Sequence, residues 1–184
     1  MRIAMFAAAG AFVFLAGCGG PQTSQANNSH ANISNESRAT SNGMVMLAAG
    51  PVSGQQAVAI MHERHEGMGT IGKTNKAIKR ELDSASPNMT TLRAGAAQIA
   101  DLSRKASGWF PPGTGPDVGK TGAKPDIWRD PQDFASKLHN FQAAAATFNQ
   151  AAMSGDVNLI KAKWGELGQA CKACHDKYRT EMHH

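Results

Sequence analysis

The stretch "GQACKACHDKYR", residues 168–179, lies close to the end of a 184-residue chain and contains two of its three cysteines. A Cys-x-x-Cys pair serves as a redox disulfide, as half of a zinc site or as the covalent anchor of a cofactor. These three uses need different surroundings in the folded chain. The role of Cys171 and Cys174 therefore depends on the elements around them.

The composition favours helices over strands. Aromatic residues make up only 6% of the chain, whereas alanine is abundant. Alanine loses no side-chain entropy in a helix, and strands are enriched in branched and aromatic residues. The formal net charge of +5 is not concentrated in one segment, so it does not favour a nucleic-acid surface. We expect an all-α protein with no nucleic-acid partner.

Two helices are expected in the first half of the folded region. A capping-box pattern at Ser53 opens the first helix, which extends to about Asp83. The breaker "SASPN", residues 84–88, separates it from a second helix that ends near Gly108. A long Gly/Pro-rich crossover over residues 108–128 then follows.

Two further helices are expected after the crossover. Asp130 is placed to accept at an N-cap, and Pro131 suits the first helical position, where a missing N–H costs nothing. Gly155 ends this third helix. Asp156 caps the fourth helix, which runs to Tyr178.

Each expected helix presents its inward residues at alternating spacings of three and four. The predicted stripes are Ala57, Met61, Arg64, Met68, Ile71, Asn75, Ile78 and Leu82; Met89, Leu92, Ala96, Ile99, Ser103 and Ala106; Phe134, Leu138, Phe141, Ala145, Phe148 and Ala152; and Val157, Ile160, Trp164, Leu167, Cys171, Cys174 and Tyr178. Four such helices bury their stripes in an antiparallel, up-down-up-down four-helix bundle. The predicted domain covers residues 53–184, and both cysteines of the pair lie on its inner seam.

The N-terminal segment has the features of an export signal. Residues 1–17 contain one charge, at Arg2, and an apolar run that is too short to span a membrane. The sequence "LAGC" that ends at Cys18 resembles the lipobox of bacterial lipoproteins, which implies that Cys18 becomes a lipid-modified N-terminus. An ordinary secretory cleavage near the same point is the alternative. Residues 18–52 contain few large apolar side chains, so we expect a disordered, lipid-anchored tether.

The surroundings of the cysteine pair separate the three uses. A thioredoxin-type pair starts a helix that follows a strand, because the helix N-terminus lowers the thiolate pKa, whereas this pair ends a helix. A zinc site needs further ligands, which His183 and His184 supply only if the chain end folds back. His175 directly follows the second cysteine, and Cys-x-x-Cys-His is the attachment sequence of c-type haem. We therefore predict one covalent haem c, held by two thioethers, with His175 on the iron.

The position of this motif on the last of four helices resembles that of class II cytochromes c, meaning cytochrome c′ and its low-spin, methionine-ligated relatives. The resemblance covers about residues 53–180. It includes "CKACHDKYR", "ERHEGMG" on the first helix, and "GWFPPGTGP" and "KPDIW" in the crossover. Cytochrome c′ is itself a standard example of the four-helix bundle, so the predicted architecture is not independent of this resemblance.

The resemblance implies roles for residues on the first and last helices. Arg64 lies on the apolar stripe, where a cation needs an anion, and it matches a family arginine that pairs with a haem propionate. Met68 matches the residue that faces the iron, which ligates it in the low-spin branch and blocks the site in the high-spin branch. Core packing is the alternative for Met68, and Met61 is a second candidate ligand. Arg179 resembles an arginine near the proximal haem face, with stabilisation of the helix dipole as the alternative.

Other residues near these positions carry weaker expectations. Gly67, Gly69 and Gly72 are expected to let the first helix approach the macrocycle. Surface positions are expected for His62, His65 and His139. Packing in the core or against the haem is expected for Trp109, Phe110, Trp128 and Trp164. Either a solvated helix face or a docking patch for an acidic redox partner is expected from Lys73, Lys76 and Arg80.

These features predict a periplasmic, lipid-anchored electron carrier with His175 and Met68 as axial ligands, serving redox partners of the respiratory chain. The alternative is a five-coordinate protein of the c′ type that binds nitric oxide or carbon monoxide. A third hypothesis is a haem-free structural lipoprotein with a metal-binding "EMHH" tail. We expect no catalytic function, because no nucleophile or paired carboxylates stand out, and we leave pairing of two copies as an open expectation.

Overall fold

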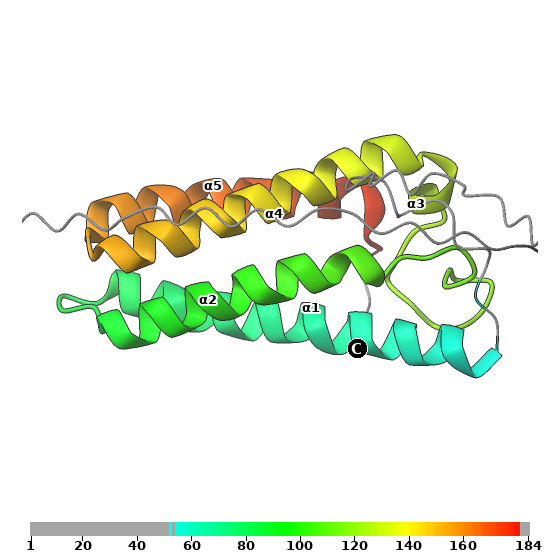
Figure 1. Cartoon of the computed structure of the whole chain (residues 1–184), viewed down its shortest axis with the longest axis horizontal. Helices are drawn as coiled ribbons and strands as arrows, with labels where there is room; N and C mark the ends of the chain where they lie inside the picture. The colour runs from blue at the N-terminus through cyan, green and yellow to red at the C-terminus, as the bar shows by residue number, and fades with distance from the viewer. Residues whose placement is uncertain (1–51, 53, 181–184) are drawn as a thin grey trace, which may run out of the picture. The chain divides into compact units, whose positions relative to one another are not determined.

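The fold consists of helices and the loops that join them (Figure 1). A computed structural model describes residue 52 and residues 54–180. The elements in chain order are α1 (Gly54–Asp83), α2 (Met89–Lys105), the 3-10 turn η1 (Ala106–Gly108), α3 (Asp126–Arg129), α4 (Pro131–Ser154) and α5 (Val157–Tyr178). The predicted all-α class and its four long helices are confirmed. The short helix α3, inside the predicted crossover, was not expected.

Side-chain caps place the boundaries of the last two long helices. Asp130 Oδ1 accepts a hydrogen bond from the backbone N–H of Asp133, and Pro131 occupies the first turn of α4. Gly155 ends α4 in the left-handed region, with φ at 81°. Asp156 then accepts from two backbone N–H groups in the first turn of α5. These boundaries agree with the sequence, because each depends on one local residue type.

The long helices pack as neighbours in the order α1, α2, α4 and α5, and the seam between α1 and α5 stays open. In Figure 1, α1 and α2 run side by side, as do α4 and α5. α2 packs on both α1 and α4, whereas the backbones of α1 and α5 seldom approach each other. The fully buried apolar side chains of the core include Ala57, Leu92, Ala96, Ile99, Phe148 and Ile160. The open seam between α1 and α5 is where a further group has room.

The crossover between α2 and α4 covers one end of the bundle and holds the end of α5. The backbone N–H of Lys124 donates to the Tyr178 carbonyl at 2.9 Å, and the N–H of Thr180 donates to the Gly122 carbonyl at 2.8 Å. A Gly/Pro-rich segment does this well, since it forms few hydrogen bonds within itself. The last turn of α5 is therefore fixed to a loop from the middle of the chain.

Several sequence predictions lie outside the described residues. They are the signal segment over residues 1–17, the lipidation of Cys18, the tether, the Ser53 cap and the "EMHH" tail. Within the part of the chain that the structure describes, no helix has the length and apolar character needed to cross a membrane.

Candidate functional site

A cavity of about 1110 Å³ lies between α1 and α5, beside the crossover. Apolar side chains from all four long helices line it, and they include Ile71, Ile99, Phe134, Leu138, Phe141 and Leu167. Sites for small molecules in proteins reach about 1,000 Å³. The cavity is therefore at the large end of that range and suits a bulky apolar ligand.

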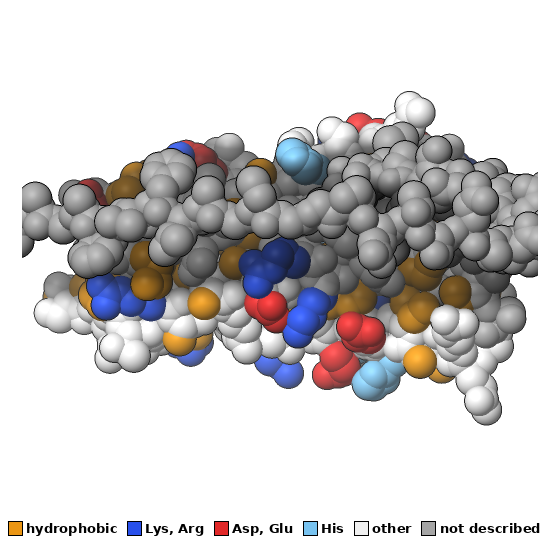
Figure 2. All heavy atoms as spheres, in the orientation of Figure 1, with side chains coloured by type: hydrophobic (Ala, Val, Ile, Leu, Met, Phe, Trp, Pro, Cys, Tyr) orange, Lys and Arg blue, Asp and Glu red, His pale blue; other side chains and the backbone are white. Residues whose placement is uncertain are grey.

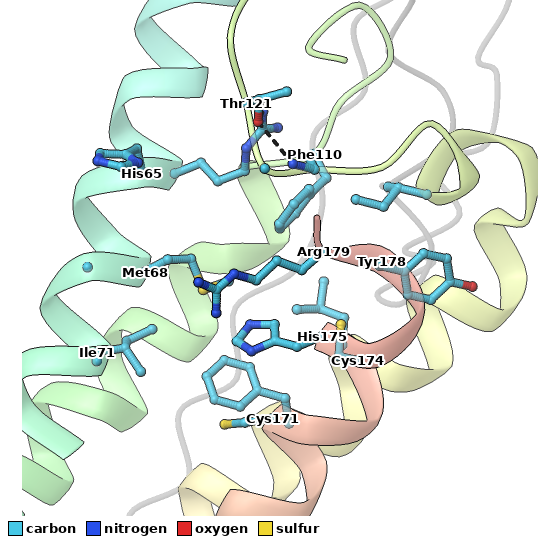
Figure 3. Close-up of a pocket in the computed structure, with 18 of the residues that line it drawn as sticks. His65, Met68, Ile71, Phe110, Thr121, Cys171, Cys174, His175, Tyr178 and Arg179 are labelled. Carbon is cyan, nitrogen blue, oxygen red and sulfur yellow. Dashed lines mark hydrogen bonds between the residues drawn. The ribbon is translucent and has the colours of Figure 1, made fainter. Parts of the chain in front are cut away.

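The α5 wall presents the cysteine pair and His175 to this cavity. Cys171 and Cys174 lie one helical turn apart and are half-buried, and the His175 imidazole projects from the same helix (Figure 3). Both thiols are free. The spacing of three residues thus puts both sulfurs and the imidazole along one edge of the cavity.

The burial of the two thiols does not match the surroundings of a redox dithiol. Burial raises the pKa of the Cys171 thiol to about 11 and also raises that of Cys174. Reactive redox cysteines instead have lowered pKa values, because the thiolate is the nucleophile. Burial, followed by the charge of Arg179, lowers the pKa of His175. His175 is therefore neutral at pH 7, which is the form that ligates a metal.

A zinc site finds no support in the residues that the structure describes. No cluster of three or more histidine, cysteine or acidic side chains occurs among them. His183 and His184, the other predicted zinc ligands, lie outside the described residues.

Met68 lies on α1 and enters the cavity from the wall opposite α5 (Figure 3). Its side chain is half-buried and packs against the core cluster. Ile71, one turn further along α1, is buried beside it. The structure thus brings Met68 and His175 to one cavity from two different helices, as the sequence predicts.

Arg64 is buried in the upper wall of the cavity, with 5% of its surface exposed. Its Nη1 donates to the Trp109 carbonyl at 2.9 Å and to Thr114 Oγ1 at 3.2 Å. Its Nη2 donates to the Thr114 carbonyl and to Thr121 Oγ1, both at 2.9 Å. The guanidinium also lies over the Phe110 ring, 5.1 Å from its centroid. Arg64 therefore ties α1 to the crossover, a role that its position on a stripe did not reveal.

The charge of Arg64 lacks an anionic partner within the described residues. No carboxylate among them forms an ion pair with it. Burial lowers its pKa to about 10, so it is still a cation at pH 7. A buried cation whose neutral acceptors are all peptide or hydroxyl groups fits an anionic group inside the cavity.

The glycines of α1 have different surroundings, which corrects one expectation. A Cβ on Gly67 would lie 2.2 Å from the Cη2 atom of Trp109, so Gly67 makes room for an indole and not for a ligand. Gly69 and Gly72 line the cavity, and nothing lies within 4 Å of a Cβ built on either. Two of the three glycines thus leave space on the cavity side, as predicted.

Aromatic residues close the cavity at the end of α5. Phe134 stacks edge to face on both Phe110 and Tyr178, at centroid distances of 4.8 and 5.2 Å. The Tyr178 hydroxyl donates to Asp133 Oδ2 at 2.6 Å. Of the other aromatic residues expected in the core, Trp109 is 2% exposed and Trp164 is half-buried. Trp109 packs against α1 and not into the cavity.

Arg179, Met61, His62 and His65 line the cavity, whereas His139 does not. Arg179 follows α5, is exposed, and directs its guanidinium towards Met68 (Figure 3). Met61 lines the cavity at the crossover end. The predicted surface positions are confirmed as exposed for His62, His65 and His139.

A Cys-x-x-Cys-His motif on the last helix of a four-helix bundle, with its histidine facing a large apolar cavity, defines a four-helix c-type cytochrome. The family model described as Cytochrome C' matches residues 59–179. The chain belongs to the cytochrome c′ family, and its cofactor is one covalent haem c.

Individual relatives agree with this assignment. Cytochrome c' of Allochromatium vinosum is 31% identical over 139 residues, which cover 73% of this chain and 86% of the relative. The crystal structure of cytochrome c' from Thermochromatium tepidum superposes with a TM-score of 0.64 at 29% identity, covering 72% of this chain and all of the other. A variant of cytochrome c prime from Alcaligenes xylosoxidans, solved as a nitric oxide complex, gives a TM-score of 0.62 at 26% identity, covering 68% and 97% of the two chains.

Proposed function

We propose that this protein binds a diatomic gas, nitric oxide or carbon monoxide, on the haem face that Met68 covers. A bound haem supplies an iron atom that can accept one gaseous ligand and can change between ferric and ferrous states. The observation that carries the proposal is the composition of the α1 wall. Opposite His175 it offers the Met68 thioether beside the apolar Ile71 (Figure 3). His62 and His65 also line the cavity from α1, but both are exposed. The side chain that faces His175 is thus a thioether and not an imidazole.

The α5 residues have the chemistry to hold the haem. Cys171 and Cys174 would each hold the haem through a thioether to one vinyl group, with the thiol hydrogen passing to the other vinyl carbon. The lowered pKa of His175 leaves a lone pair on the imidazole for the iron. Arg64 and Arg179 have the charge to meet the two propionates, one from inside the cavity and one from its rim.

A relative supports the gas-binding reading. The Alcaligenes xylosoxidans variant that shares this fold was solved as a nitric oxide complex. The shared fold and the 26% sequence identity make the same ligand class our first expectation for this chain. The electron-carrier reading that the sequence favours is therefore placed second.

Electron transfer with Met68 as the sixth ligand is the second candidate. The observation that favours it is the direction of Met68, whose side chain enters the cavity from the wall opposite His175 (Figure 3). A methionine sulfur would raise the reduction potential and complete a low-spin site. Respiratory redox proteins would then be the partners. In neither reading is the protein an enzyme.

Absorption spectra of the purified holoprotein separate the two candidates. The first predicts high-spin spectra in both oxidation states and rapid binding of carbon monoxide to the ferrous form. Met68→Ala should then raise the association rate constant about 10-fold, which corresponds to a barrier lower by ~1.4 kcal/mol. The second predicts a low-spin wild type that Met68→Ala converts to high spin. Met61→Ala, at the crossover end of the same cavity, is the matched control.

Unchanged spectra and unchanged gas kinetics in Met68→Ala, together with an effect of Met61→Ala, would remove Met68 from the iron face. A colourless protein with two titratable thiols, from a host able to attach haem c, would refute both candidates.

The cellular setting is also a proposal. We infer a periplasmic protein that is held to a bacterial membrane by lipid on Cys18, from the export signal and the "LAGC" sequence. Mass spectrometry of the mature N-terminus tests this, and Cys18→Ser should release the protein from the membrane fraction. Sedimentation of the holoprotein with and without carbon monoxide tests whether two copies pair.

A further inference from the structure

The charged side chains that line the cavity all have the same sign. Among the described residues, five basic side chains line it and no aspartate or glutamate does. These five are Arg64, Lys73, Lys76, Lys120 and Arg179. Arg64 is buried, whereas the other four are exposed. The exposed four therefore form the basic rim of the opening between α1, the crossover and α5.

Basic residues elsewhere on the described surface are mostly neutralised by a neighbour. Ion pairs with acidic side chains are formed by Lys79, Arg104, Lys105, Arg129, Lys137, Lys163, Lys172 and Lys177. On the face seen in Figure 2, basic and acidic side chains are interspersed over α1 and α2. None of the four rim residues forms an ion pair with a described residue. Outside the rim, Arg80, Arg93, Lys124 and Lys161 also lack an ion pair with a described residue, but none of them lines the cavity. The basic rim is thus distinguished by four such residues around one opening.

The haem does not neutralise this charge. Two propionates supply two negative charges, and Arg64 with Arg179 accounts for them. Lys73, Lys76 and Lys120 are left in excess at the opening. Unpaired like charges around one opening repel one another, so they imply an anionic partner from outside the chain.

The rim is too long for a small anion. Gly119, next to Lys120, contacts the Met61 side chain, since a Cβ there would lie 3.2 Å from the Met61 methyl group. Lys76 lies fifteen residues further along α1, which at ~1.5 Å per residue places it about 22 Å away. Protein interfaces bury ~800 Å² on each partner, which corresponds to a patch of roughly this length.

We propose that the basic rim is the docking surface for an acidic redox protein, which exchanges one electron with the haem through this opening. One electron leaves the partner and enters the haem, and no bond is made or broken. Lysine suits a brief encounter, because its ammonium is a compact, hydrated charge that steers an approaching anion without a fixed geometry. The inference rests on the proposed function, since it needs haem in the cavity. It applies to both candidates, because a haem that binds carbon monoxide must first be reduced.

Binding of a small acidic redox protein to the holoprotein tests the proposal. The probe is an oxidised plant-type [2Fe–2S] ferredoxin, titrated calorimetrically at low and high ionic strength. Lys73→Glu and Lys76→Glu are each compared with Lys161→Glu, which makes the same charge change at an exposed α5 residue outside the cavity. Each rim variant should weaken binding about 5-fold at low salt, and salt should weaken wild-type binding, whereas Lys161→Glu should change it less than 2-fold.

Two further measurements make the result decisive. Amide chemical shifts of α1 and the crossover should move when the ferredoxin is titrated in. Reduction of the haem by reduced ferredoxin should also slow more in the rim variants than its reduction by dithionite, a small anion. Equal effects of all three variants, equal effects on ferredoxin and dithionite, or tighter binding of a basic redox protein would each overturn the proposal. Haem content and carbon monoxide affinity of the same samples report on the proposed function separately.

Discussion

The indole nitrogen of Trp164 on α5 donates to the side-chain oxygen of Asn75 on α1 at 2.6 Å. Among the described residues this is the single side-chain hydrogen bond between the two helices that border the cavity. Asn75 lines the cavity one turn beyond Ile71, and Trp164 packs against the core cluster. The open seam between α1 and α5 is therefore fixed at this level by one polar pair.

Removal of this pair should destabilise the holoprotein. Trp164→Phe leaves the Asn75 oxygen without its donor, which should cost about 1 kcal/mol in the free energy of unfolding. A double-mutant cycle with Asn75→Leu should give a coupling energy of about 1 kcal/mol in urea denaturation. Thr74→Val is the control, because it removes an exposed bond to Gln98 on α2. A coupling energy near zero would contradict the assignment.

Substitution of Gly67 should disturb the contact between α1 and Trp109. The added methyl group would overlap the indole, which lies 2.2 Å from the Cβ position, so Gly67→Ala should destabilise by about 1–3 kcal/mol. Gly165→Ala, in α5 with nothing within 4 Å, should instead stabilise by up to ~1 kcal/mol through helix propensity. Chemical denaturation of both variants measures whether the free energy of unfolding falls in Gly67→Ala and rises in Gly165→Ala.

Replacement of Arg64 should loosen the crossover as well as the haem environment. Arg64→Met leaves acceptors on Trp109, Thr114 and Thr121 without their donor. The free energy of unfolding should therefore fall by about 3 kcal/mol or more. Limited proteolysis should then cut the crossover over residues 108–128 faster. Arg80→Met, at an exposed α1 position, is the control. Unchanged stability in Arg64→Met would show that these bonds do not hold the loop.

The fall in the free energy of unfolding at acidic pH should depend on Asp133. Hydrogen bonds from Tyr178 and Lys177 hold the pKa of this carboxyl below its usual value. A pKa that is lower in the folded state gives stability that is present above the unfolded pKa of ~3.9 and is lost as pH falls through the folded value. Asp133→Asn should therefore be less stable than wild type at pH 7, and the difference should shrink below about pH 4.

The matched control for this pH dependence is Glu66→Gln, which removes one charge at an exposed α1 residue without an ion pair among the described residues. At pH 7 it should destabilise the protein less than Asp133→Asn does. A difference between Asp133→Asn and wild type that stays constant from pH 7 to pH 3 would contradict the role of Asp133.

Sequence reasoning predicted the features that depend on short patterns. The caps at Asp130 and Asp156, the left-handed stop at Gly155 and the buried stripe of α4 each follow from residue type and spacing. The attachment motif was found because its five residues are adjacent. Met68 was placed on the cavity because it falls on a helical stripe, with the family resemblance adding its role.

Features that depend on distant segments were missed. The bonds from Arg64 to the crossover span at least 45 residues, and the Trp164–Asn75 pair spans 89. Gly67 was assigned to the macrocycle because periodicity gives the face of a helix but not the neighbour that fills it. Lys120 belongs to no pattern in the sequence, and only the folded crossover brings it to the rim with Lys73.

The crossover joins the two walls of the cavity mechanically. Gly122 accepts from Thr180, just beyond the helix that carries His175, and the adjacent Thr121 accepts from Arg64, one turn from Met68. A displacement of either wall therefore strains hydrogen bonds to the same two loop residues, Thr121 and Gly122. The haem-bearing helix and the helix that faces it cannot shift independently without breaking one of these bonds.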